Sequence, residues 1–198
     1  IKIINKKEIN MKFFTLLWLL ISINSAAEDD HHDHHHDHHH EEHEKKEKKS
    51  LDAHVHGVST LKIVQDNNKL SFEFEMPGFD VVGFEYKAKK KEDIKKVKNA
   101  LKVLSDYTNM LHLSETAKCT EDKNSARVIN EGSHSEFMSE YILNCKNITQ
   151  LKELKIEFFK SFEYSKKLNI ELVSKNKTMS YQMDRLNNSI DVKNFFND

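Results

Sequence analysis

The sequence predicts an α+β protein: a single domain with a mainly antiparallel sheet, two β-hairpins and at least one long amphipathic helix. Two pairs of neighbouring segments alternate apolar and polar residues, and this pattern predicts the hairpins. A lysine-rich run with apolar residues at helical spacing predicts the helix. A histidine-rich arm, which we expect to be disordered, precedes this domain.

Residues 1–27 are interpreted as an export signal with a few upstream residues. From Met11 the chain has one basic residue, Lys12, then the apolar run FFTLLWLLISI, then small residues at Ser25 and Ala27. This order predicts cleavage after Ala27. The apolar run is shorter than the roughly 20 residues that a membrane-spanning helix needs, so no stable membrane insertion is expected. We therefore expect a soluble, periplasmic mature protein.

Residues 28–49 form the arm. Its segment DDHHDHHHDHHHEEHE has nine histidines among acidic residues and no apolar side chain, so it cannot build a core. A solvated spacer is one interpretation, because charged low-complexity runs often serve only as spacers. We prefer metal capture, because neutral imidazole favours Zn²⁺, Cu²⁺ and Ni²⁺. Binding should weaken as pH falls through the ordinary histidine pKa of about 6.5. The candidate ligands are His31, His32, His34, His35, His36, His38, His39, His40 and His43.

Residues 50–198 are long enough for one domain with its own core. They contain 23 Lys and Arg against 22 Asp and Glu, and this balance does not suggest a nucleic-acid partner. Cys119 and Cys145 are the only cysteines, and in an oxidising compartment such a pair predicts one disulfide. The alternative, a pair of metal-binding thiolates, is disfavoured because the two are far apart and form no CxxC motif.

The strands of this domain follow from alternation. VSTLKIV and KLSFEFEM should pair through the turn residues DNNK, and the second strand should end at Pro77 and Gly78. LNIELVS and TMSYQMD should form the second hairpin, while EYILNC and LKIEFF are further strand candidates. The helix is expected over 92–104, with an apolar stripe of Ile94, Val97, Leu101 and Leu104. Its lysines are read as a solvated face in preference to a basic patch for an anionic partner.

The stretch LDAHVHGVSTL contains the first candidate metal ligands of the domain. In a strand, Asp52, His54 and His56 would share the outer face, because residues two apart point the same way. Val55, Leu61 and Ile63 would then face the core. Two imidazoles at this spacing can reach one ion, as in many zinc sites.

Two further histidines lie elsewhere in the domain. His134 and Glu136 in GSHSEF are again two residues apart, whereas His112 stands between apolar neighbours and is expected to be a half-buried structural residue.

Several blocks, taken in order, resemble the ZrgA-type family of zinc-regulated periplasmic zinc-binding proteins. They are HVHGVSTLKIV, LSFEFEMPGFDVVGFEY, AKCT, HSEFMSEYILNC and LKELKIEFFKSF, and they span nearly all of residues 52–183. The resemblance implies zinc binding in the periplasm and assistance to a zinc ABC transporter or its solute-binding protein. It implicates His54, His56 and His134, with Glu136 and Glu85 as further candidates, and it agrees with the cysteine pair. Tyr86 departs from the pattern, because the family is expected to have histidine there.

The sequence therefore predicts a non-enzymatic protein that binds Zn²⁺ at a folded histidine site and through its arm, and that supports zinc uptake or homeostasis. One alternative is a zinc-dependent hydrolase with Glu136 as general base, although HExxH and similar motifs are missing. Another is a docking module for a zinc ABC transporter, with the arm as its only metal site. Imidazole ligands alone do not separate zinc from copper or nickel.

Overall fold

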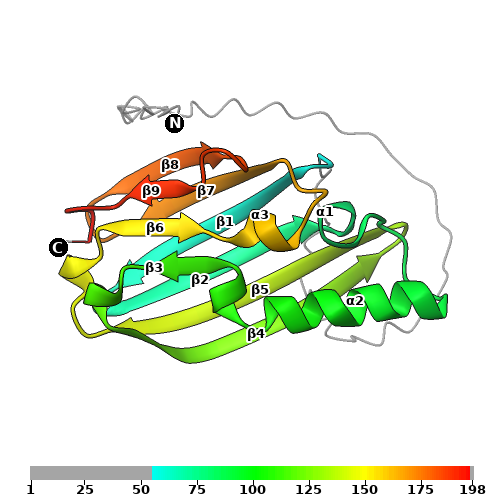
Figure 1. Cartoon of the computed structure of the whole chain (residues 1–198), viewed down its shortest axis with the longest axis horizontal. Helices are drawn as coiled ribbons and strands as arrows, with labels where there is room; N and C mark the ends of the chain where they lie inside the picture. The colour runs from blue at the N-terminus through cyan, green and yellow to red at the C-terminus, as the bar shows by residue number, and fades with distance from the viewer. Residues whose placement is uncertain (1–54, 197–198) are drawn as a thin grey trace, which may run out of the picture. The chain divides into compact units, whose positions relative to one another are not determined.

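The computed structural model describes residues 55–196 of the chain. Its main element is a six-stranded sheet, here called the large sheet, with the strand order β4-β5-β2-β1-β7-β8 (Figure 1). Neighbouring strands are antiparallel except β1 and β7, which are parallel. The strands are β1 (Val58–Asp66), β2 (Lys69–Pro77), β4 (Cys119–Glu131), β5 (His134–Cys145), β7 (Lys167–Val173) and β8 (Thr178–Met183). The expected α+β domain with a mainly antiparallel sheet is thus confirmed.

A second layer covers one face of the large sheet. It contains a three-stranded sheet in the order β3-β6-β9, together with helices α2 and α3, which Figure 1 shows in front of the large sheet. The strands are β3 (Leu111–Leu113), β6 (Glu153–Ile156) and β9 (Ser189–Asp191). The helices are α1 (Gly78–Val82), α2 (Lys91–Leu104) and α3 (Phe158–Ser161), and the 3-10 turns are η1 (Tyr107–Asn109), η2 (Glu115–Ala117) and η3 (Ile148–Gln150).

The core fills the space between the two layers. On β2 every second residue is buried, and Phe72 and Phe74 are almost fully enclosed, as the alternation predicts. Phe74 contacts Phe158 of α3 with ring centroids 5.9 Å apart, which joins the large sheet to the second layer. Tyr141 of β5 donates a hydrogen bond from its buried hydroxyl to the carbonyl of Leu104 at the end of α2. A single hydrophobic core therefore joins the two layers.

Both predicted hairpins are present. β1 pairs with β2 and β7 pairs with β8, each antiparallel through a short turn. The strand predicted at EYILNC is the second half of β5. In LKIEFF only the first residues are extended, because the chain turns into α3 at Phe158. The long edge strand β4 was not expected, since most of its side chains are exposed and its sequence does not alternate.

Two details of the prediction are wrong. Val55 does not face the core: it is 67% exposed, because β1 begins only at Val58 and the preceding turn breaks the alternation. The long helix exists, but it is less clearly amphipathic than expected, since Ile94 is 38% exposed. The buried positions of α2 include Asp93 and Ala100, so the inward face is rotated away from the predicted stripe.

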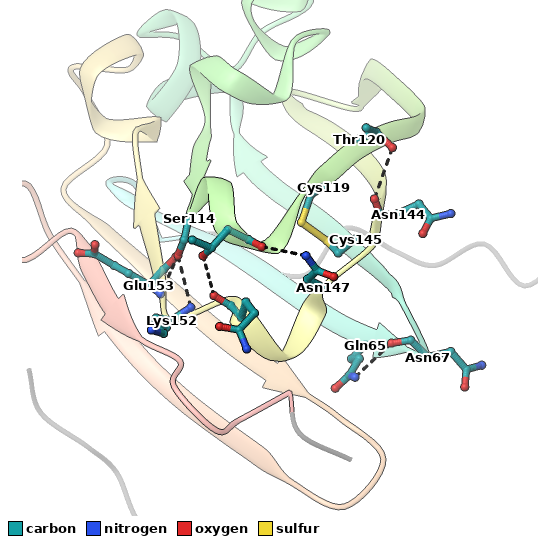
Figure 2. The surroundings of a disulfide bond; sticks show 12 residues. Gln65, Asn67, Ser114, Cys119, Thr120, Asn144, Cys145, Asn147, Lys152 and Glu153 are labelled. Atoms are coloured by element: carbon teal, nitrogen blue, oxygen red, sulfur yellow. Dashed lines mark hydrogen bonds between the residues drawn. A yellow bond between two sulfur atoms is a disulfide. The ribbon is translucent and has the colours of Figure 1, made fainter.

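The predicted disulfide joins Cys119 and Cys145 (Figure 2). These residues are direct partners in the β4–β5 register, so the bond anchors the beginning of the edge strand. Hydrogen bonds stabilise the segments around it: Ser114 Oγ accepts from the backbone N–H groups of Lys152 and Glu153 at 3.3 and 3.2 Å. The disulfide lies at the end of β5 that is opposite to His134.

Candidate metal centre

Three strand ends meet at one edge of the large sheet. Because β2 runs antiparallel to both β1 and β5, the end of β2 lies beside the beginnings of the other two strands. Pro77, the last residue of β2, pairs with Glu136 near the start of β5, and α1 follows β2 directly, beside these strand ends in Figure 1. His56 lies just before β1 and His134 is the first residue of β5. The topology therefore brings together two histidines that are far apart in the sequence.

A tight turn presents His56. Gly57 has a φ of 85°, a left-handed conformation that favours glycine. Its N–H donates to Asp80 Oδ1 at 2.6 Å, and the hydroxyl of Ser59 donates to Asp80 Oδ2 at 2.8 Å. Asp80 belongs to α1 and is fully buried. The turn that carries His56 is therefore tied to α1 through one buried carboxylate.

An aromatic contact restricts the ring of His56. The ring stacks on Phe79 of α1, with centroids 4.8 Å apart and an interplanar angle of 16°. Phe79 in turn packs against Tyr164, with centroids 5.5 Å apart. This stack directs the imidazole edge toward the loop that follows α1.

Gly83 starts that loop. It has a φ of 82°, and a Cβ there would lie 2.9 Å from the ring of Tyr164, so both conformation and space favour glycine. The reversal at Gly83 leads the chain to Glu85.

Glu85 lies between the two histidines. Its Oε1 is 3.0 Å from Nε2 of His56, and its Oε2 is 2.8 Å from Nδ1 of His134. The Glu85 side chain is only 12% exposed, whereas those of His56 and His134 are 55% and 60% exposed. Oε2 of Glu85 and Nδ1 of His134 form a hydrogen bond. Oε1 of Glu85 lies close to His56, but among residues 55–196 no donor is oriented to form a hydrogen bond with it. The carboxylate is thus enclosed by protein on one side and by two accessible rings on the other.

The two carboxylates of this region are perturbed in opposite directions. Burial alone would raise the pKa of Glu85, but the contacts with His134 and His56 and the positive charge of these rings outweigh it, so this pKa is lowered. For Asp80, burial outweighs the hydrogen bonds from Gly57 and Ser59, so its pKa is raised. Glu85 therefore suits the role of an ionised group facing cations, while Asp80 suits the role of a structural acceptor.

The family model of the ZrgA family zinc uptake proteins matches residues 53–192. The chain belongs to this family. It has no significant match among curated proteins. Membership connects the chain with zinc, and imidazole nitrogen and carboxylate oxygen are the atom types found at the convergence of the strands. In the part of the chain from 55 to 196, none of the helices has the length and apolar character needed to cross a membrane.

The structure brings together three of the predicted site residues of this ZrgA family member: His56, His134 and Glu85. Glu136 is buried in β5, two residues beyond His134. His54 and the nine histidines of the arm lie outside the described residues. His112 is not half-buried as expected: it is the exposed middle residue of β3, because both apolar neighbours turn inward and leave it on the outer side.

Tyr86, the position at which a histidine is expected in the family, lies next to Glu85 but contacts α2. Its hydroxyl donates to Oδ2 of Asp93 at 3.0 Å, and its ring stacks on Phe84 with centroids 4.6 Å apart. The Tyr86 ring is thereby held against α2, one residue after Glu85.

Within residues 55–196, no group of three or more His, Cys, Asp or Glu side chains is arranged around a common point where a metal ion would fit. The reason is visible in the geometry of Glu85: each ring faces a different carboxylate oxygen, so the donors surround the carboxylate rather than an empty centre. Binding of a cation would need the imidazole N–H groups to give up their protons and the rings to turn by a small amount. The exposure of both rings allows such a rotation.

Sequence reasoning missed two residues of this site, Phe79 and Asp80. A usable signal was present: Asp80 is the one charged residue in the otherwise apolar stretch PGFDVVGF, and a lone carboxylate in an apolar run is often a buried acceptor. The contact of Phe79 with His56 carries no comparable sequence signal, because it depends on how α1 folds back on the turn.

Proposed function

We propose that the protein is an exported zinc-binding protein of the periplasm, which captures Zn²⁺ and supports zinc uptake or homeostasis. The domain site is formed by His56, Glu85 and His134, with His54 as a further candidate from the adjacent segment. The observation that carries the proposal is the position of Glu85, whose two oxygens lie 3.0 and 2.8 Å from the nitrogens of the two histidines. Family membership supports zinc as the ion.

The chemistry of these groups suits reversible binding. Zinc takes neutral imidazole nitrogen and carboxylate oxygen in tetrahedral coordination, so three protein ligands leave a fourth position for water or another histidine. The lowered pKa keeps Glu85 ionised, while Phe79 and Asp80 position His56 before the ion arrives. Because both rings are more than half exposed, a bound ion would stay accessible to a receiving protein. A zinc ABC transporter or its solute-binding protein is the partner that we propose.

Binding is proposed in preference to zinc-dependent hydrolysis. A hydrolase needs a carboxylate that is free to take a proton from a metal-bound water. Glu85 is instead engaged with both rings, and Glu136 is buried in β5. A site of this construction favours holding the ion over activating water. Hydrolytic activity that persists in excess zinc and disappears in the His56→Ala variant would support the enzyme instead.

The test is a calorimetric zinc titration of the chain from Glu28, with the nine arm histidines changed to glutamine so that only the domain site remains. We expect the zinc affinity of that site to fall in each of the variants His56→Ala, His134→Ala and Glu85→Gln. Loss of a group that only supports a ligand lowers metal affinity by about 10- to 100-fold, and loss of a ligand should lower it by at least as much. His112→Ala, on the exposed side of β3, is the matched control and should change nothing. A tight site that survives all three changes would overturn the assignment. Loss of all binding in the arm variant itself would leave the arm as the only metal site.

A further inference from the structure

A basic hollow adjoins the candidate metal centre. It has a volume of about 510 Å³ and is lined by Tyr86, Lys87, Lys89, Lys90, Asp93 and Gly132. Tyr86 directly follows Glu85, and Gly132 precedes His134 by two residues. The hollow is therefore built from two of the three chain segments that form the metal centre, those of Glu85 and His134.

The hollow carries excess positive charge. Lys87, Lys89 and Lys90 are exposed, and within residues 55–196 none of the three forms an ion pair. The segment 87–98 contains seven lysines and two acidic residues, although the domain as a whole is nearly neutral. The N-terminus of α2 adds to this field, because its first residue follows Lys90 and no side chain caps it. Asp93 is the opposing charge in the hollow, and the hydroxyl of Tyr86 donates to it.

The same chain contains a segment of opposite charge. Residues 28–44 have eight carboxylates and nine histidines and no lysine or arginine. Glu44 stands twelve residues before His56, a length that can span at most about 40 Å. Along the chain, the segment is therefore followed closely by His56, a proposed ligand of the metal centre. Tethering raises the effective concentration of one group at the other, so weak contacts suffice to bring them together.

We propose that the lysine-lined hollow is the docking site for the acidic, histidine-rich segment 28–44 of the same chain. Docking holds carboxylates of the arm against Lys87, Lys89 and Lys90, and it places the neighbouring imidazoles next to His56 and His134. The contact is electrostatic and salt-sensitive. The metal-transfer part of this inference rests on the proposed function, whereas the docking itself does not require a metal.

Zero-length carbodiimide cross-linking of the metal-stripped chain from Glu28 tests the docking, because it joins only carboxylates and lysines that touch. Segment 28–44 should cross-link to Lys87, Lys89 and Lys90 about fivefold more than to the exposed lysines Lys146, Lys152 and Lys175, if tethered contact governs the yield. The preference should disappear in about 1 M salt, where the screening length falls to about 3 Å. Mixing isotopically light and heavy protein separates links within one chain from links between copies.

The matched variants are Lys87→Glu/Lys89→Glu/Lys90→Glu and Lys146→Glu/Lys152→Glu/Lys175→Glu, which change the net charge equally. Only the first should abolish the links from segment 28–44 to the neighbouring Lys91. Equal yields over all exposed lysines, links confined to Lys45–Lys49, or links only between copies would each overturn the proposal. Because no metal is present, failure here leaves the zinc titration untouched, and failure of the titration leaves the docking result untouched.

Discussion

Replacing Asp80 with alanine should weaken both the fold and the metal centre. The carboxylate is fully buried and accepts hydrogen bonds from the Gly57 N–H at 2.6 Å and from the Ser59 hydroxyl at 2.8 Å. Gly57 is buried as well, and its neighbour His56 is a proposed ligand. In Asp80→Ala both donors lose their acceptor and water cannot readily replace it.

The size of the effect follows from these two bonds. A buried donor without a partner costs about 1–3 kcal/mol, so the two together would cost about 2–6 kcal/mol. The variant also removes the unfavourable burial of the carboxylate, which raises the pKa of Asp80 in the native protein. We therefore expect a loss in the lower part of the range, about 2–3 kcal/mol in the free energy of unfolding. Zinc affinity should fall by about 10- to 100-fold, because the turn that carries His56 is no longer held.

Two matched variants separate the causes. Asp80→Asn keeps an acceptor for Gly57 and should cost only about 1 kcal/mol. Ser59→Ala removes one of the two donors but leaves the Gly57 bond, so it should lower stability by about 1 kcal/mol and leave zinc affinity unchanged. Urea denaturation measures the free energy of unfolding, and calorimetry measures the zinc affinity. If Asp80→Ala binds zinc as tightly as Ser59→Ala does, Asp80 does not position His56 and the reasoning is refuted.

Three further outcomes are expected. Changing both Cys119 and Cys145 to serine should lower the free energy of unfolding by about 3.5 kcal/mol, because the unfolded chain gains conformational entropy when the cross-link is removed. Urea denaturation measures this change, and an unchanged midpoint would contradict it. Tyr141→Phe should cost about 1–2 kcal/mol, since the buried carbonyl of Leu104 loses its donor, and thermal unfolding is the assay. Because burial raises the pKa of Asp80, its contribution to stability is fully present below the unfolded pKa of about 3.9 and declines as pH rises through the folded value. The stability of the native protein relative to Asp80→Asn should therefore fall as pH rises from about 3.9 through the folded pKa of Asp80. A difference in stability that stays constant with pH would contradict a raised pKa for Asp80.

Some features of the protein follow from sequence pattern alone. Alternation along Lys69–Pro77 determines which side chains are buried, and the turn residues before it determine the partner strand, because both are local properties of the chain. The cysteine pair could be predicted from its even number and from the expected oxidising compartment, and the structure confirms the disulfide. The candidate ligands His56, His134 and Glu85 were identified from local spacing and family resemblance, but neither gives their mutual distances.

Only the tertiary structure decided how these residues meet. His56 lies outside β1, since Gly57 adopts a left-handed conformation that an extended pattern does not reveal. The inward face of α2 includes Asp93 in place of Ile94, because packing against the large sheet rather than helical periodicity selects the buried residues. The sequence by itself determined the types of group at the site: imidazoles, a carboxylate and a nearby run of lysines. The antiparallel order of β1, β2 and β5 decided their convergence, because only the pairing of distant strands brings residues 56, 85 and 134 to one edge of a sheet.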